Sequence, residues 1–323
     1  MELMHHYSNV VSKEALLTGE GIATIWREYI PQEGLKHGFL MHGLLAFSAL
    51  NLADLNRHSP EAMARYLSVC DKHQAIAIAA LRDALNGNVT AENSGALFAL
   101  AAVTSISSMA RSCAMANARP GPHALTIDEI AEYVLLTRGV REVTTLTYGH
   151  VLHTPISVMF RFNAVEDTEA AALPLSAPVQ SHFSTLHSML DEYHASTTTS
   201  SDGGSNEKTL AYCRAALSTL ESTYLNLRYW NSHGGVESGH IWRWPATLET
   251  GFTHLIAARY PPALVLVAHF GAATTPLRKA WYLRDWGTYA FAGISMALDG
   301  NDIIKWMEWP REQMKSNMSI VLD

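Results

Sequence analysis

The chain has 323 residues, of which 48% are hydrophobic and only 16% charged, and its net charge is −7. This composition is typical of a globular protein with a large interior. The 23 basic residues form no basic stripe along the sequence, which argues against direct nucleic-acid contact by this chain. The apolar runs are shorter than the ~20 residues that a membrane-spanning helix needs, so we expect no membrane span. The first ten residues lack the basic start and apolar run of a secretory signal.

Helical signals dominate the first half of the chain. Ser59, Pro60 and Glu61 are typical of a helix start, and the apolar spacing behind them predicts a helix that ends at Gly87. A second helix, rich in alanine, is expected at about 91–115, where small side chains favour close helix packing. Thr126 and Glu129 have the spacing of a capping box and predict a third helix.

The second half continues the same pattern after a proline-rich break at 173–178. A helix is expected at about 179–194. The polar, low-complexity segment 196–206 predicts a flexible loop, with Asn206 as the cap of the following helix. Further helices are predicted at about 245–258, 261–274, 278–297 and 302–308.

The pattern as a whole predicts an all-α fold, because we find no alternating strand pattern and no glycine-rich phosphate loop. We expect a single large domain over residues 1–323, with about ten or more packed helices that enclose a hydrophobic pocket.

The cysteines and histidines give no metal signature. Cys70, Cys113 and Cys213 are far apart and odd in number, so we expect reduced core thiols of an intracellular protein and no thiolate zinc site. None of the 16 histidines lies in an HExxH frame. The sequence therefore predicts neither a bound metal nor a cofactor.

His42 and His269 each interrupt an apolar helical segment. A buried imidazole needs a hydrogen-bond partner or a wet cavity. Each is therefore either a hydrogen-bonded core histidine or a polar group that lines a pocket.

The segment 236–310 contains an apolar and aromatic block that two Trp-Pro steps bracket, at 244–245 and 309–310. Such a block lines either a filled core or a cavity suited to a sterol, a terpene or a polyketide. The residues that we expect to contact a hydrophobic ligand are His42, Phe47, Trp242, Trp244, Phe252, Leu266, His269, Phe270, Trp281 and Trp286.

No catalytic constellation stands out, because the chain has no GxSxG motif and no cysteine in a known nucleophile signature. If the chain is an enzyme, its candidate acid and base groups are His42, Glu237, His269 and Asp285. Burial beside Trp242 and Trp244 would raise the pKa of the Glu237 carboxyl and suit it to general acid chemistry.

Several ordered blocks resemble the C-terminal regulatory domain of fungal zinc-cluster transcription factors of the sterol-uptake-control type. They include LMHHYSNVVS, FLMHGLLAFSALNLA, KHQAIAIAALRDAL, ENSGALFALAAVTSI, LLTRGVREV, VESGHIWRWP, PPALVLVAHFGAATTPLRKAWYLRDWGTY and WMEWP. The resemblance extends over about residues 3–310. It implies an all-helical domain that binds a hydrophobic ligand, whose occupancy controls retention in the cytosol, entry into the nucleus and gene activation.

The six-cysteine zinc cluster of that family does not occur in these 323 residues. The chain is therefore either a portion of a longer regulator or a stand-alone protein. We favour a ligand-sensing regulatory domain, cytoplasmic or nuclear or both, with a homodimer as a possible assembly. The alternatives are a metal- and cofactor-free cyclase or isomerase of fungal secondary metabolism, in which the pocket holds a reactive conformer, and a pure interaction module.

Overall fold

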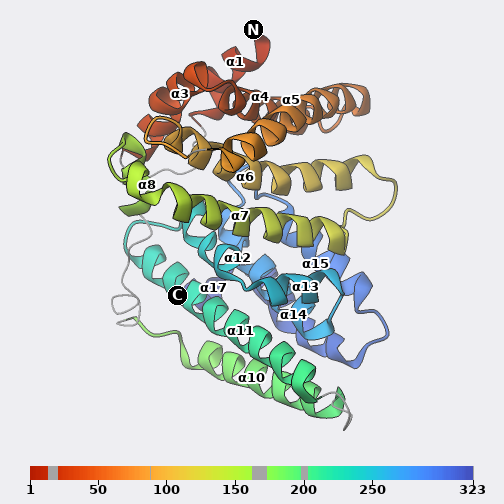
Figure 1. The fold of residues 1–323 in the computed structure, drawn as a ribbon. Coiled ribbons are helices and arrows are strands. Elements are labelled where there is room, and N and C mark those ends of the chain that lie inside the picture. Colours follow the sequence, from red (N-terminus) through yellow and green to blue (C-terminus); the bar gives the residue numbers. More distant parts are fainter. Residues whose placement is uncertain (14–20, 88, 162–172, 198–202, 323) are drawn as a thin grey trace. The chain divides into compact units, whose positions relative to one another are not determined.

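Figure 1 shows the computed structural model, which describes residues 1–13, 21–87, 89–161, 173–197 and 203–322. Every secondary-structure element in these residues is a helix, so the prediction of an all-α, multi-helix fold is confirmed. The chain divides into two compact units, each built from separated stretches. Unit 1 contains residues 1–122, 136–164 and 280–282, and unit 2 contains residues 123–135, 165–279 and 283–323. The single domain over 1–323 stays a prediction.

Unit 1 packs around two apolar helices, α4 and α6. Its elements are α1 (Glu2–His6), η1 (Tyr7–Val11), α2 (Ile22–Thr24), η2 (Ile25–Tyr29), α3 (Ile30–Lys36), α4 (Gly38–Leu55), α5 (Pro60–Asn86), α6 (Ser94–Ala118), the later part of α7 (Ile127–Val151), η3 (Pro155–Ser157) and α8 (Val158–Arg161). At Gly43 of α4 a Cβ atom would collide with the Leu100 side chain of α6. The absence of a side chain at Gly43 thus lets α4 pack closely on Leu100 of α6.

Helices α4 and α6 are also long and apolar enough, by length and composition alone, to cross a membrane. The expectation of no membrane span considered only uninterrupted runs of apolar residues. Serine, threonine and glycine interrupt such runs in these two helices but are compatible with a span. In unit 1, 56% of the apolar window of α4 and 89% of that of α6 are buried by other parts of the protein. Their apolar character is therefore accounted for by core packing, and the absence of a span stays a prediction.

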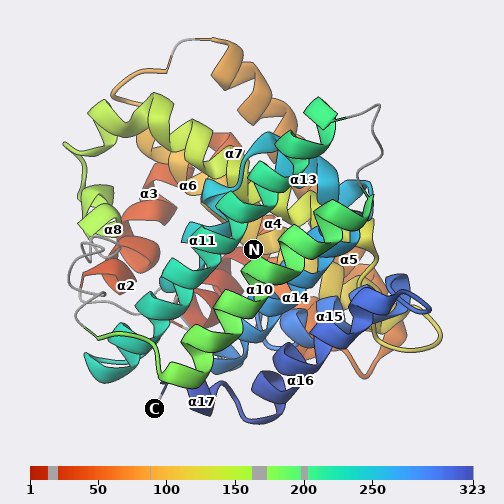
Figure 2. The same cartoon turned by 90° about the horizontal axis from the view of Figure 1, so that it is seen from below.

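Unit 2 is built around α14, in which every residue from Pro262 to Ala273 is buried. Its elements are the first part of α7, α10 (Ala177–Thr197), α11 (Gly203–Ser232), η4 (Ser238–Ile241), α12 (Arg243–Thr247), α13 (Thr250–Ala257), α14 (Pro261–Ala273), η5 (Thr275–Leu277), α15 (Trp286–Ala297), η6 (Asp302–Met307), α16 (Glu308–Lys315) and α17 (Ser319–Leu322). Helices α11, α13, α15 and α16 all contact α14. Figure 2 shows α10 and α11 side by side.

The predicted helix starts are largely confirmed. Helix α5 begins at Pro60 and is followed by Gly87 as its C-cap. The Thr126–Glu129 capping box forms: the Thr126 N–H donates to Glu129 Oε2 at 2.8 Å, and the Glu129 N–H donates to Thr126 Oγ1 at 3.2 Å.

Two predicted helices and one predicted loop differ from the structure. The helix expected at 245–258 is broken between α12 and α13, because Leu248 and Glu249 have ψ angles of 137° and 152°, far from helical values. The helix expected at 278–297 begins only at Trp286. In the expected 196–206 loop, residues 196–197 belong to α10 and 203–206 to α11, so Asn206 is not a helix start. Residues 198–202 lie outside the described residues.

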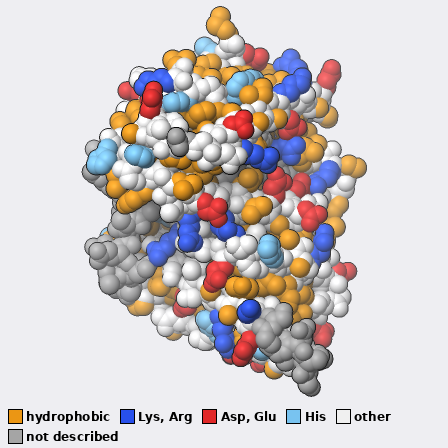
Figure 3. All heavy atoms as spheres, viewed as in Figure 1, with side chains coloured by type: hydrophobic (Ala, Val, Ile, Leu, Met, Phe, Trp, Pro, Cys, Tyr) orange, Lys and Arg blue, Asp and Glu red, His pale blue; other side chains and the backbone are white. Residues whose placement is uncertain are grey.

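Acidic and basic side chains are mixed on the face that Figure 3 shows. On the face shown in Figure 3, Lys and Arg side chains lie among Asp and Glu side chains rather than in one field. The three cysteines are free and buried, and burial raises the pKa of the Cys70 and Cys213 thiols to about 12. At neutral pH these two are therefore protonated core residues, as the sequence predicts.

Candidate ligand-binding site

The residues expected to contact a ligand divide between the two units. His42, Phe47 and Trp281 belong to unit 1, and the remaining ones, Trp242, Trp244, Phe252, Leu266, His269, Phe270 and Trp286, belong to unit 2.

Most of the unit 2 residues form one aromatic cluster, consisting of Trp242, Trp244, Phe252, Phe270 and Trp286 together with Tyr133. The Trp244 and Phe270 rings stack with centroids 4.7 Å apart, and Phe270 meets the edge of Trp286 at 5.7 Å. These are ordinary distances between packed rings. All members except Trp242 are fully buried, so the rings fill much of the space between their helices with one another.

The two central tryptophans of this cluster differ in their hydrogen bonding. Trp244 Nε1 donates to the Ala216 carbonyl of α11 at 2.9 Å. Trp286 Nε1 is equally buried, yet it has no hydrogen-bond partner within the described residues. A buried donor without a partner costs about 1–3 kcal/mol, so Trp286 Nε1 is a place where a ligand or a water could supply an acceptor.

His269 lies beside this cluster in a histidine stack, which we define as His182 of α10, His269 of α14 and Trp309 of α16. The imidazole of His182 stacks on Trp309 with centroids 4.2 Å apart and on His269 at 5.2 Å. His269 Nδ1 lies 2.8 Å from the Val265 carbonyl, which only accepts, so Nδ1 carries the proton. Nε2 of the neutral His269 ring then accepts from His182 Nε2, 3.0 Å away.

Burial keeps both imidazoles neutral. It lowers the pKa of His269 to about 4, and burial together with the neighbouring His269 lowers the pKa of His182 to about 3. The Tyr224 hydroxyl donates to the His269 carbonyl at 2.7 Å. His269 therefore has the geometry of a hydrogen-bonded core histidine, the first of the two alternatives that its sequence context left open.

The unit 1 residues make two separate contacts, one by Phe47 and Trp281 and one by His42. Phe47 packs against Trp281 with ring centroids 5.1 Å apart and against Tyr282 at 6.3 Å. His42 Nδ1 lies 2.8 Å from His73 Nδ1, so one ring donates to the other. Burial, with a smaller effect of His42, lowers the pKa of His73. His42 thus has the partner that its apolar surroundings require.

The four residues proposed for an enzyme serve separate structural purposes. His42 belongs to unit 1, whereas Glu237, His269 and Asp285 belong to unit 2. Glu237 is the N-cap of η4, where its backbone N–H donates to His240 Nδ1 at 3.0 Å, and Asp285 occupies the N-cap position of α15. His42 and His269 each have a hydrogen-bonding partner, and Glu237 and Asp285 each stand at a helix start. Their catalytic roles stay a prediction.

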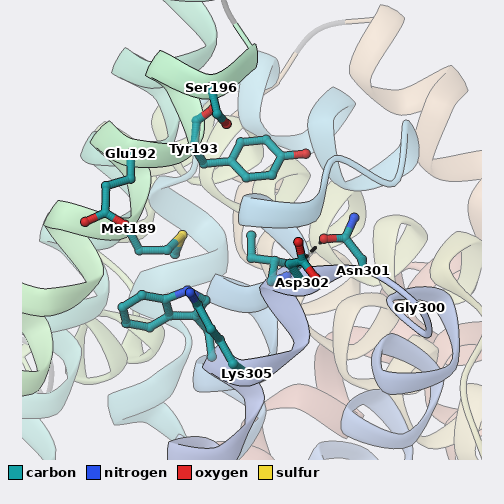
Figure 4. Close-up of a pocket in the computed structure, with 10 residues that line it drawn as sticks. Met189, Glu192, Tyr193, Ser196, Gly300, Asn301, Asp302 and Lys305 are labelled. Atoms are coloured by element: carbon teal, nitrogen blue, oxygen red, sulfur yellow. Dashed lines mark hydrogen bonds between the residues drawn. The ribbon is translucent and has the colours of Figure 1, made fainter.

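A groove that the sequence did not predict lies in unit 2 between α10 and the turn before α16 (Figure 4). It has a volume of about 540 Å³ and is lined by Met189, Glu192, Tyr193, Ser196, Gly300, Asn301, Asp302, Ile303, Lys305 and Trp306. The lining residues of α10 have i, i+3, i+4, i+7 spacing and so share one helix face. That spacing is the only sequence signal for the groove, and nothing in the sequence places 300–306 opposite it.

No family model matches the chain. It is 24% identical over 319 residues to a Zn(2)-C6 fungal-type transcription factor of Gibberella zeae, an alignment that covers 96% of this chain and 60% of the relative. It is 27% identical over 173 residues to sterol uptake control protein 2 of Saccharomyces cerevisiae, covering 54% of this chain and 17% of that protein. With sterol uptake control protein 2 of Candida albicans it shares 34% identity over 122 residues, or 37% of this chain and 16% of that protein.

These relatives confirm the resemblance to fungal zinc-cluster transcription factors that the sequence blocks indicate. The chain spans 60% of the length of the first relative and less than a fifth of the other two. The homology thus concerns a part of each of those proteins, and these 323 residues, with three cysteines, do not contain a six-cysteine cluster.

Proposed function

We propose that this chain is a ligand-sensing regulatory region of a fungal transcription regulator and that its ligand is a hydrophobic small molecule of the sterol or terpenoid class. The observation that carries the proposal is the homology to a Zn(2)-C6 fungal-type transcription factor along 96% of the chain. The sterol class is favoured by the names of the two other relatives, which are sterol uptake control proteins. The site of action is the cytoplasm, the nucleus or both.

The proposed ligand site is the aromatic cluster of unit 2 with Leu266 and His269. The roles of His42, Phe47 and Trp281 of unit 1 as ligand contacts stay separate predictions. The cluster supplies apolar surface, and Trp286 Nε1 supplies one buried donor that has no hydrogen-bond partner among the described residues. A rigid polycyclic molecule with one hydroxyl group matches this combination, because its oxygen would accept from the indole N–H. Since the rings contact one another, ligand entry requires them to separate.

The proposed mechanism is a population shift. A ligand that binds only the arrangement with separated rings stabilises that arrangement of α12–α15 and changes which surface the region offers to a partner. The shift cannot exceed the difference in ligand affinity between the two arrangements. A ligand at a hundred times its Kd adds about 2.7 kcal/mol of stability, which a melting experiment detects.

The test is a matched pair of substitutions, Trp286→Phe and Trp244→Phe. Both remove one indole from a fully buried position, but only Trp244 has a hydrogen bond to lose within the protein. We expect Trp286→Phe to weaken the binding of a cyclodextrin-solubilised sterol by about tenfold, the effect of losing one hydrogen bond. Trp244→Phe should lower the free energy of unfolding by about 1 kcal/mol more than Trp286→Phe does, with a smaller change in ligand affinity.

The measurements are a sterol titration followed by melting temperature and a urea unfolding curve of each variant without ligand. The proposal is contradicted if no sterol or terpenoid raises the melting temperature of the unsubstituted chain. The assignment of Trp286 is contradicted if the two variants lose ligand affinity equally.

A further inference from the structure

The groove between α10 and η6 has two walls of similar chemistry. The α10 wall presents Tyr193 and Glu192, and the η6 wall presents Trp306 and Asp302, so each wall offers one aromatic ring and one carboxylate. Met189 and Ile303, both almost fully buried, supply the apolar surface between them. In Figure 4 the Tyr193 ring points from α10 toward the turn that holds Asn301 and Asp302.

The charged side chains of the groove have no ion-pair partner in the part of the chain that the structure describes. Among the described residues no ion pair involves the side chains of Glu192, Asp302 or Lys305. The lining therefore has two carboxylates against one ammonium group. Lys305 Nζ itself lies 5.9 Å from the centroid of the Trp306 ring, which places a cation near that ring and its attractive quadrupole.

The turn that carries Asp302 is held in place by a glycine conformation and a side-chain cap within the turn. Gly300 has a φ of 74°, a backbone conformation that residues with a side chain rarely adopt. Asn301 Oδ1 accepts a hydrogen bond from the Ile303 N–H at 3.0 Å. The η6 wall is thus preorganised, and the α10 wall is one face of a long helix. Binding a small molecule between two ordered walls avoids the entropy of ordering a loop.

We propose that this groove binds an apolar molecule that carries an ammonium group. The apolar body lies on Met189 and Ile303 between the two rings, and the cation lies near Glu192 and Asp302, where the rings and the carboxylates both attract it. A volume of about 540 Å³ accommodates a molecule of drug-like size. The site is distinct from the aromatic cluster, so it does not depend on the identity of the proposed sterol-class ligand.

Three probes with the same polycyclic body separate charge recognition from simple apolar binding. They are 1-adamantyl-trimethylammonium, 1-adamantanemethanol and adamantane-1-carboxylate, titrated into the full chain by calorimetry. The cation is expected to bind, with an affinity that falls as salt is raised. It should bind at least fivefold more tightly than the neutral probe, and the anion should bind most weakly.

Single substitutions in the lining are expected to change the affinity for the cationic probe in opposite directions, according to the charge that is removed. Glu192→Gln and Asp302→Asn should each weaken binding of the cation by about two- to fivefold, and Lys305→Gln should strengthen it by a similar factor. Asp299→Asn is the control, because Asp299 is an exposed carboxylate in the same turn that does not line the groove. It should leave the affinity within twofold.

The proposal is overturned if the cationic probe does not bind at millimolar concentration, or if the neutral probe binds as tightly as the cation. It is equally overturned if Lys305→Gln weakens binding of the cation or if Asp299→Asn acts like Asp302→Asn. A sterol that binds the chain while the cation does not would leave the proposed sensor function intact and refute only this site.

Discussion

At the scale of single residues, three neutral histidines distinguish unit 2. Burial lowers the pKa of His269 and of His240 to about 4, and that of His182 to about 3, against 6.5 for an unperturbed imidazole. Between these values and 6.5 the unfolded chain binds protons that the folded chain does not. Stability contributed by these histidines is therefore fully present above pH 6.5 and is lost as the pH falls toward 4 for His269 and His240 and toward 3 for His182.

The substitution His269→Gln tests this dependence. The glutamine amide can occupy the position of Nε2 and accept from His182, but it does not titrate. We expect the slope of unfolding free energy against pH, measured by urea unfolding between pH 4.5 and 6, to fall by up to about 1.4 kcal/mol per pH unit. His153→Gln, at an exposed position, is the control and should leave the slope unchanged. An unaltered slope in His269→Gln would show that His269 is not held neutral by burial.

At the scale of elements, the crossing of α14 and α15 depends on two glycines. A Cβ atom at Gly287 would collide with the Gly271 carbonyl oxygen and the Thr274 hydroxyl. The first of these is a backbone atom that cannot rotate away, so the two helices can approach closely only without a side chain at this position.

Gly287→Ala should therefore lower the free energy of unfolding by at least about 2 kcal/mol through overpacking. The matched control is Gly139→Ala in α7, where a Cβ atom meets nothing within 4 Å. That change should raise the free energy of unfolding by about 0.5–1 kcal/mol, because alanine is the better helix former. Urea unfolding of both variants checks the pair, and equal effects of the two substitutions would refute the close crossing.

Helix ends could be predicted from the sequence where residues next to them in the chain determine them. The Pro60 start, the Gly87 end and the Thr126–Glu129 box depend on neighbouring residues and were predicted correctly. The break at Leu248 and Glu249 has no glycine or proline at the two residues that leave helical geometry, so local propensity gives no signal for it. The start of α15 was predicted too early. The apolar spacing of residues 278–285 matches that of the helix that follows, but the helix itself begins only at Trp286.

The candidate site was predictable in composition but not in arrangement. Aromatic density at 242–286 correctly indicated a buried ring cluster, because such rings cannot be solvated. Tyr133 was missed, since it comes from α7, more than a hundred residues earlier. The groove was missed because its lining residues are unremarkable individually and are brought together only by the packing of α10 against η6 and α16.

At the scale of the whole molecule, the chain is acidic, is helical throughout the described secondary structure, and is homologous to part of a fungal transcription factor. The net charge of −7, and the sequence without a basic stripe, argue against direct DNA contact by this chain. A regulatory region that acts through a small molecule and a protein partner is consistent with this charge.

The central claim is that the chain binds a hydrophobic small molecule without transforming it. Native mass spectrometry of the purified chain after incubation with a sterol or terpenoid tests this most directly, with the released molecule identified afterwards. The account predicts one ligand bound per chain and its release unchanged. A chain that binds none of these molecules, or one that releases a cyclised or isomerised product, would contradict it.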